Sequence, residues 1–211
     1  MDEHEFQRGI DALEEFRHQF ETASLKSRIC QSVLAAPDDW ALPHPATSTD
    51  QIGYVPIDID AFLDCLLDLD DCLRHDPDFR HESLKYRPFS FLEVGCGIGR
   101  NINIVARQPH LPVAKAVGID VVAEFVAVGK AMYGLDGNLL IRDCLDFDYS
   151  GFDVVYFFRP FADAEMQVRF EEYLMAGLRK GAILIAVGAE RVDNAPLMMP
   201  VGQTGHLFKV L

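Results

Sequence analysis

The sequence lacks an apolar run long enough to cross a membrane. Its longest apolar stretches, at 154–158 and 182–189, are far shorter than the ~20 residues that a transmembrane helix requires. The first residues carry several acidic side chains where an export signal would have a basic region followed by an apolar core. We therefore expect neither membrane insertion nor export, which makes the cytoplasm the default location.

The cysteines are too few and too scattered for a disulfide framework or a zinc site. There are five, an odd number, and no two of them form a C-x-x-C pair. The histidines likewise show no spacing typical of metal ligands. We interpret the thiols as reduced and mostly buried, and we expect no metal site. The cysteines are Cys30, Cys65, Cys72, Cys96 and Cys144.

Basic charge is also scarce, because 19 Lys and Arg face 33 Asp and Glu, for a net charge of −14. The imbalance is concentrated in residues 1–88, which hold 19 of the acidic residues and only 8 of the basic ones. A nucleic-acid-binding protein normally has a basic patch, since each phosphate contact needs a cation. We therefore expect no nucleic-acid partner, and we interpret the acidic excess mainly as solvated helix surface.

What the first part of the chain does contain is helical periodicity. Apolar residues recur every three or four positions from 5 to 35 and again from 59 to 73, which predicts amphipathic helices. A proline-rich connector separates them, and Asp76-Pro77 ends the second helix. We predict a helical extension over 1–88 that provides a lid over the substrate or a homodimer surface.

From residue 89 onwards the pattern changes to short apolar runs that alternate with helical segments. Continuous apolar runs are typical of strands buried on both faces, and their alternation with helices predicts parallel pairing. We therefore predict an α/β domain over 89–211, with a doubly wound, mostly parallel sheet of the Rossmann-like kind. The predicted strands are 89–94, 116–120, 138–143, 152–158 and 182–189, followed by a closing hairpin of 197–201 and 206–211.

The segment FLEVGCGIGRN, at 91–101, places glycines at 95, 97 and 99 between a predicted strand and a predicted helix. Glycine lets a ligand approach such a turn closely, and sheets of this kind bind ligands at the carboxyl ends of their strands. Asp120 ends the second strand, where a carboxylate can accept hydrogen bonds from ribose hydroxyls, and Asp143 ends the third. The pattern predicts a ligand that contains adenosine.

The spacing of the glycines and the neighbouring charged residues distinguish between ligands that contain adenosine. The dinucleotide fingerprint is G-x-G-x-x-G, but here the third glycine comes one residue early and Arg100 follows it. Glu93 would repel a pyrophosphate, whereas it suits a ligand with an ammonium group. The arrangement resembles the class I S-adenosylmethionine-dependent methyltransferases, whose first motif is an acid followed by G-x-G-x-G. The resemblance covers about 89–190.

The resemblance implies a role for each matching residue. Glu93 would orient the amino group of the methionine part, and Asp120 would hold the ribose hydroxyls. Asp143 and the backbone of Cys144 would meet the adenine edge, with Val121 or Leu145 packed on its face. For each acidic residue the alternative is a carboxylate that caps a helix or a turn. The implied S-adenosylmethionine site comprises Glu93, Gly95, Cys96, Gly97, Asp120, Val121, Asp143 and Cys144.

Candidates for the acceptor side follow the fourth strand, where the chain has Phe158, Arg159, Pro160 and Phe161. Enzymes of this class that methylate amide or base nitrogens commonly have Asn or Asp followed by Pro-Pro and an aromatic residue there. This sequence lacks the amide or acid, which argues against that chemistry. Arg159 would hold an anionic substrate group, or else pair with a surface acid.

A lid is suggested by GYVPID, at 53–58, which resembles a segment that folds over the cofactor in relatives that methylate lysine. Tyr54 and Pro56 are the candidate lid residues, and a hydrophobic staple at the start of the next helix is the alternative. The sequence identifies no catalytic residue.

The function that this resemblance implies is methyl transfer from S-adenosylmethionine to a small-molecule or protein acceptor. Two alternatives remain at this point. One is a non-catalytic partner or regulatory subunit with the same fold, because no acceptor site is recognisable. The other is an NAD-dependent oxidoreductase, which would use a similar sheet but needs the later third glycine.

Overall fold

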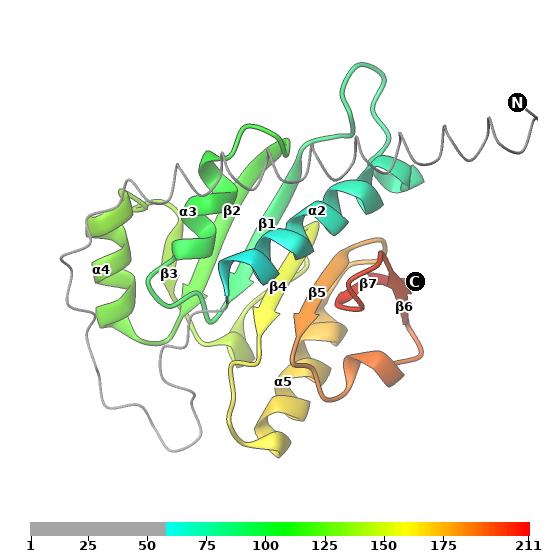
Figure 1. The fold of residues 1–211 in the computed structure, drawn as a ribbon. Helices are drawn as coiled ribbons and strands as arrows, with labels where there is room; N and C mark the ends of the chain where they lie inside the picture. Colours follow the sequence, from blue (N-terminus) through cyan, green and yellow to red (C-terminus); the bar gives the residue numbers. More distant parts are fainter. Residues whose placement is uncertain (1–57) are drawn as a thin grey trace, which may run out of the picture. The chain divides into compact units, whose positions relative to one another are not determined.

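The structure is a computed structural model that describes residues 58–211 (Figure 1). The helix predicted over 5–35 and the lid candidates Tyr54 and Pro56 lie outside the described residues. In the described part, no helix is both long and apolar enough to span a bilayer.

The strands form one seven-stranded sheet in the order β3-β2-β1-β4-β5-β7-β6 (Figure 1). Strands β1 to β5 pair in parallel, whereas β7 runs antiparallel to both β5 and β6. The strands are β1 Phe89–Val94, β2 Val113–Asp120, β3 Leu139–Ile141, β4 Val154–Phe158, β5 Ile183–Val187, β6 Met198–Val201 and β7 Leu207–Val210.

This sheet confirms the predicted doubly wound, mostly parallel architecture, including the closing hairpin of β6 and β7. Every strand except β1 departs from its predicted bounds by one to three residues at one or both ends, and the reason is visible for two of them. Strand β2 begins three residues before the predicted 116, and its first residues are partly or fully exposed, which hides them from an apolar pattern. Strand β3 ends at Ile141, because Asp143 already caps the short 3₁₀ helix Cys144–Asp146.

Alternating strand residues contact helices on opposite faces of the sheet. Tyr156 packs edge-on against Phe62, with ring centroids 5.1 Å apart, whereas the next residue, Phe157, packs against Phe170 at 5.2 Å. Phe62 belongs to α2 and Phe170 to α5, so these helices cover opposite faces, as Figure 1 shows. The helices are α2 Ile59–His75, α3 Arg100–Arg107, α4 Ala123–Tyr133 and α5 Ala164–Gly177.

Helix α2 runs antiparallel to the parallel strands, and its first turn lies beside the ends of β1 and β4 in Figure 1. Asp58 caps it by accepting hydrogen bonds from the backbone N–H groups of Asp60 and Ala61. Further along, buried Asp68 accepts from the backbone N–H groups of Gln203 and Thr204, at 2.8–2.9 Å. These bonds fasten α2 to the β6–β7 hairpin. The domain boundary at 88/89 stays a prediction.

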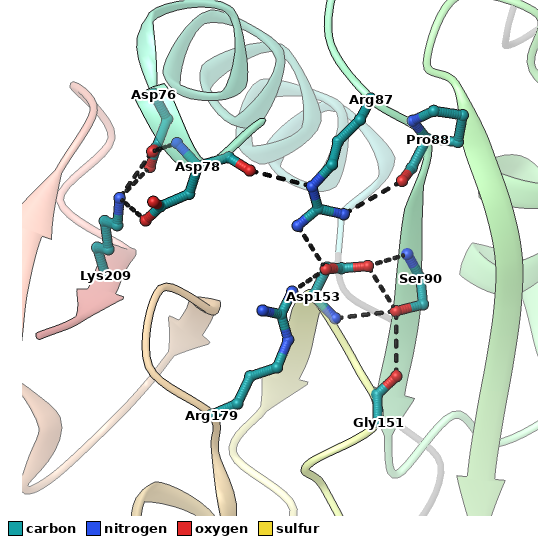
Figure 2. A network of polar contacts seen from close by, with 9 residues as sticks. All are labelled: Asp76, Asp78, Arg87, Pro88, Ser90, Gly151, Asp153, Arg179 and Lys209. Atoms are coloured by element: carbon teal, nitrogen blue, oxygen red, sulfur yellow. Dashed lines mark hydrogen bonds and ion pairs between the residues drawn. The ribbon is translucent and has the colours of Figure 1, made fainter. Parts of the chain in front are cut away.

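A polar network closes the end of the sheet at which β1 and β4 begin (Figure 2). Asp153 accepts hydrogen bonds of 2.7 Å from both the backbone and the hydroxyl of Ser90, and one of 2.8 Å from Arg87. It also pairs with Arg179. Burial opposes ionisation of Asp153, but the bonds from Arg87 and Ser90 prevail and lower its pKa. This end of the sheet is therefore occupied by internal contacts.

The four cysteines within the described residues are free thiols, in agreement with the prediction. Cys65, Cys96 and Cys144 are buried, and Cys72 is half-buried. Burial, with nearby carboxylates, raises the pKa of Cys65 and of Cys72 to about 11. Such thiols are poor nucleophiles at neutral pH and serve as packing residues.

Candidate functional site

The glycine loop lies at the carboxyl ends of β1 and β2, opposite the network around Asp153. Gly95, Gly97 and Gly99 have φ angles of +71°, +53° and +75°, in the left-handed region where other residues are strained. The backbone N–H groups of Gly95 and Cys96 donate to the carbonyl of Ile119, at 2.9 and 3.0 Å. These two bonds hold the loop over the end of β2, so the predicted turn is present.

Cys96 contributes its backbone to this site but turns its side chain inward. A Cβ atom placed on Gly118 of β2 would stand 2.7 Å from the Cys96 Sγ atom, which shows how closely the thiol packs beneath the loop. Burial raises the pKa of the Cys96 thiol well above its usual value. Only the main chain of Cys96 is therefore placed to meet a ligand.

Asp120 and Gly97 are brought together, as the predicted site requires. The Asp120 carboxylate accepts a hydrogen bond from the Gly97 N–H at 2.8 Å and, with its other oxygen, one from Val122 N–H at 2.9 Å. Burial raises the pKa of Asp120, and these backbone bonds counteract the rise. Each carboxylate oxygen can accept a further hydrogen bond. Asp120 thus combines the capping role with free acceptor capacity, and its contact with a ribose stays a prediction.

Glu93 lies on β1 behind the loop, with only 4% of its surface exposed. Its Oε1 accepts a hydrogen bond of 2.7 Å from Nδ2 of Asn101 in α3, whereas Oε2 has no partner among the described residues. Burial raises the pKa of Glu93 to about 8, against the opposing effects of Asn101 and Arg100. A buried carboxyl with one unused oxygen is suited to a cationic ligand.

Two residues of this arrangement were missed by the sequence analysis. Asn101 follows the glycine loop, and its position in the motif gave no sign that it would hold Glu93. Tyr156 of β4 stands opposite Glu93 in the β1–β4 pairing, and its hydroxyl is buried with no partner among the described residues. Only the β1–β4 pairing could have indicated Tyr156, because nothing local in the sequence does.

The residues predicted to meet the adenine lie at the ends of β2 and β3. Val121 exposes 41% of its surface directly after Asp120, so an apolar ligand face could cover it. Asp143 is exposed and accepts a hydrogen bond from Leu145 N–H at 2.8 Å, which is the capping alternative. The Cys144 thiol is turned into the core. Contact of Asp143 and Cys144 with adenine stays a prediction.

The acceptor-side candidates after β4 point in different directions. Phe158 is 37% exposed at the strand end, but Phe161 is only 8% exposed and packs against Phe170 in the core. Arg159 forms an ion pair with Glu190, so the alternative of a surface pair is the one observed. Arg159 also has a φ of +25°, which is rare for a residue other than glycine.

A buried carboxylate of α5 holds the loops that follow β4 and β5. Glu171 accepts hydrogen bonds from three consecutive backbone N–H groups, of Glu190, Arg191 and Val192, at 2.6–3.2 Å. Its neighbour Gln167 donates to Glu171 and accepts from the Phe161 N–H. The sequence analysis missed both residues, because their partners lie far away along the chain.

Comparison with known proteins finds no matching family profile and no significantly matching curated protein. Among solved structures, an RNA methyltransferase from Salinibacter ruber in complex with S-adenosyl-L-homocysteine is similar to this chain. It is 17% identical, and the match has a TM-score of 0.50 and covers 74% of this chain and 92% of that one.

Two further methyltransferase structures match more weakly. They are the plantazolicin methyltransferase BpumL, at 22% identity and a TM-score of 0.43, and the amino pentose methyltransferase CalS10 from Micromonospora echinaspora, at 24% and 0.42. Each match covers 58% of this chain, and this chain spans about half the length of each of those proteins, 46% and 49%.

The described part of the chain has the class I methyltransferase fold, as the Salinibacter ruber structure shows. The strand order adds a physical distinction from the dinucleotide-binding fold, whose classic order is 3-2-1-4-5-6. Here β7 enters antiparallel between β5 and β6. The topology and the early third glycine together disfavour the NAD-dependent alternative.

Proposed function

We propose that this chain binds S-adenosylmethionine at the carboxyl ends of β1, β2 and β3 and transfers its methyl group to a small-molecule or protein acceptor. The observation that carries the proposal is the pairing of Asp120 with the Gly97 amide, beside a buried Glu93 whose Oε2 is unpartnered. A nucleoside with a cationic amino-acid end matches both features.

The residues at this site fit the parts of the proposed cofactor. The ammonium group would compensate the buried Glu93 carboxylate, which otherwise stays protonated to avoid an isolated buried charge. The ribose hydroxyls would donate to the remaining acceptor capacity of Asp120. The adenine would cover the exposed side chain of Val121 and meet Asp143 and the Cys144 backbone.

Bound S-adenosylmethionine would supply a methyl group on a sulfonium that an electron-rich acceptor atom can attack. The chain would contribute by holding donor and acceptor in line and by excluding water, which can account for much of a rate enhancement. Phe158 is the exposed side chain at the end of β4 and would form part of the acceptor surface. The Arg159–Glu190 pair lies beside it on the adjacent loops.

Specific observations on the segment after β4 also support the alternative of a non-catalytic partner or regulatory subunit. The segment 158–161 lacks an acceptor-binding amide or acid, Arg159 is engaged by Glu190, and the Phe161 ring lies in the core. These features leave few groups to recognise an acceptor. The two functions differ in turnover rather than in cofactor binding.

The test has two stages. Calorimetry with S-adenosylhomocysteine should show binding, and NADH should show none; the reverse result would support the oxidoreductase. Methyl transfer should then be measured by the release of S-adenosylhomocysteine with small-molecule amines and hydroxyl compounds, peptides and RNA as separate acceptors. RNA is included because of the Salinibacter ruber similarity, although the acidic charge disfavours it. Binding without turnover on any acceptor would support the non-catalytic function.

A further inference from the structure

Two buried polar atoms on neighbouring strands have no hydrogen-bond partner among the described residues. They are Oε2 of Glu93 and the hydroxyl oxygen of Tyr156, whose residues are 4% and 1% exposed. Glu93 and Tyr156 are directly paired in the β1–β4 register, so their side chains leave the same face of the sheet. Burying polar atoms without partners is unfavourable, so this juxtaposition calls for an explanation.

Packing alone does not explain the Tyr156 hydroxyl. The other fully buried tyrosines each use theirs, since Tyr86 donates to Asp70 at 2.7 Å and Tyr149 donates to the carbonyl of Cys144 at 2.6 Å. A phenylalanine at 156 would keep the edge-on contact with Phe62 and would bury no unsatisfied group. The hydroxyl is therefore the part of Tyr156 that the fold does not require.

We propose that Tyr156 is a cofactor-positioning residue whose hydroxyl, together with Oε2 of Glu93, receives the ammonium group of the amino-acid end of S-adenosylmethionine. The inference rests on the proposed function and adds a residue that the glycine-loop motif does not contain. An ammonium group has three donors and no acceptor. Two buried oxygens without partners among the described residues, on paired residues of adjacent strands, match it, directly or through one ordered water.

This arrangement makes a prediction about selectivity. S-adenosylhomocysteine and 5′-methylthioadenosine share the adenosine and the sulfur, but only the first carries an amino-acid end. The Tyr156 hydroxyl should therefore contribute to binding of the first and be indifferent to the second. Because it accepts from a charged donor in a buried setting, its contribution should be larger than that of an exposed hydrogen bond.

The experiment compares Tyr156→Phe with the parent by calorimetry. The variant should bind S-adenosylhomocysteine about 5- to 30-fold more weakly and 5′-methylthioadenosine equally well. Its melting temperature without ligand should be unchanged or higher, since no partner loses a hydrogen bond. Tyr149→Phe is the matched control, because it removes a satisfied buried hydroxyl on the other face of the sheet. It should lower the melting temperature and leave the ratio of the two affinities unchanged.

An analogue of S-adenosylhomocysteine without the amino group completes a cycle with Tyr156→Phe. The parent should bind the analogue more weakly than S-adenosylhomocysteine, and Tyr156→Phe should then cause little further loss. Equal losses for all ligands, or a lower melting temperature of unliganded Tyr156→Phe, would overturn the inference and leave the proposed function standing. A parent that binds none of the ligands would overturn both.

Discussion

Gly129 of α4 lies directly against the carbonyl of Ile98 in the glycine loop. A Cβ atom on Gly129 would stand 2.1 Å from that oxygen and 2.7 Å from a methyl carbon of Leu139 in β3. Glycine in a helix interior is unfavourable by about 1 kcal/mol relative to alanine. The close approach explains its presence here: only a residue without a side chain lets α4 support the back of the loop.

Gly129→Ala should therefore destabilise the protein by about 1–3 kcal/mol, because overpacking outweighs the gain in helix propensity. It should also weaken binding of S-adenosylhomocysteine, since Ile98 must shift. Urea denaturation and calorimetry measure the two effects. Gly137→Ala is the control, because no atom lies within 4 Å of its added Cβ, and its stability should change by less than about 0.5 kcal/mol. A stabilised Gly129→Ala protein would contradict the close approach.

Asp120→Asn should weaken binding of S-adenosylhomocysteine by about 10- to 100-fold. The amide keeps one acceptor oxygen but loses the negative charge that strengthens hydrogen bonds to ribose hydroxyls, each worth about 1.5–3 kcal/mol. It also places an N–H group against the backbone donor of Gly97 or Val122. Calorimetry measures the loss.

The control for Asp120 is Asp136→Asn, a matched change at an exposed acid in the turn after α4. Its affinity for S-adenosylhomocysteine should equal that of the parent. If both variants bind as the parent does, Asp120 does not face the ligand, and the proposed position of the ribose is wrong.

Stability without ligand should depend on pH through Glu93. Burial raises its pKa from 4.5 to about 8, so between these values the unfolded chain is ionised while the folded chain keeps the proton. The resulting penalty is absent below pH 4.5, grows as the pH rises, and is complete above pH 8. Glu93→Gln, which stays neutral, should match the parent near pH 4 and exceed its unfolding free energy by up to about 4 kcal/mol at pH 8.

Denaturant titrations at several pH values test this prediction, and the difference between variant and parent removes the effect of other titrating groups, such as Asp120. Saturating S-adenosylhomocysteine should reduce the advantage of the variant, because an ammonium group stabilises the ionised form of Glu93. A difference that does not change with pH would show that Glu93 ionises normally in the folded protein.

The features that could be predicted from the sequence are those that depend on residues close together along the chain. The strand β1, the left-handed glycines and the acids at the ends of β2 and β3 are local patterns, because a buried strand must be apolar and a tight turn needs glycine. The contacts made by Asn101, Tyr156 and Glu171 are different. Their partners depend on how the strands and helices are placed, and no spacing rule identifies a buried partner on another element.

For Asp143 and Phe161 the motif gave the residue type but not the surroundings of the side chain. Both occupy motif positions, yet Asp143 caps the 3₁₀ helix that follows it and the Phe161 ring packs against Phe170. A motif gives the residue type at a position, whereas the side-chain direction follows from local capping and from the space left in the core. The capping bond of Asp143 and the core packing of Phe161 therefore could not be predicted from the motif alone.

Glu171→Gln should destabilise the protein by about 2–4 kcal/mol, because its new N–H₂ group must face backbone donors of Glu190, Arg191 or Val192 and leaves at least one of them unpaired. Glu172→Gln is the control. That neighbour is exposed, and among the described residues it makes only a 3.9 Å ion pair with Arg191, so the change should stay within about 0.5 kcal/mol. Equal effects of the two changes on stability would contradict the role of Glu171 in holding the loops that follow β4 and β5.

The affinity for S-adenosylhomocysteine tests whether the loops held by Glu171 belong to the cofactor site. The partners of Glu171 lie in the loop after β5 and, through Gln167, in the loop after β4, and none of them belongs to the glycine loop. Under conditions in which Glu171→Gln is fully folded, its affinity for S-adenosylhomocysteine should therefore stay within about twofold of the parent. Methyl transfer, once an acceptor is identified, should fall through weaker acceptor binding, because the loop after β4 directly follows Phe158, the proposed acceptor-side residue. A loss of S-adenosylhomocysteine affinity as large as that of Asp120→Asn would mean that the two loops contact the cofactor instead of the acceptor.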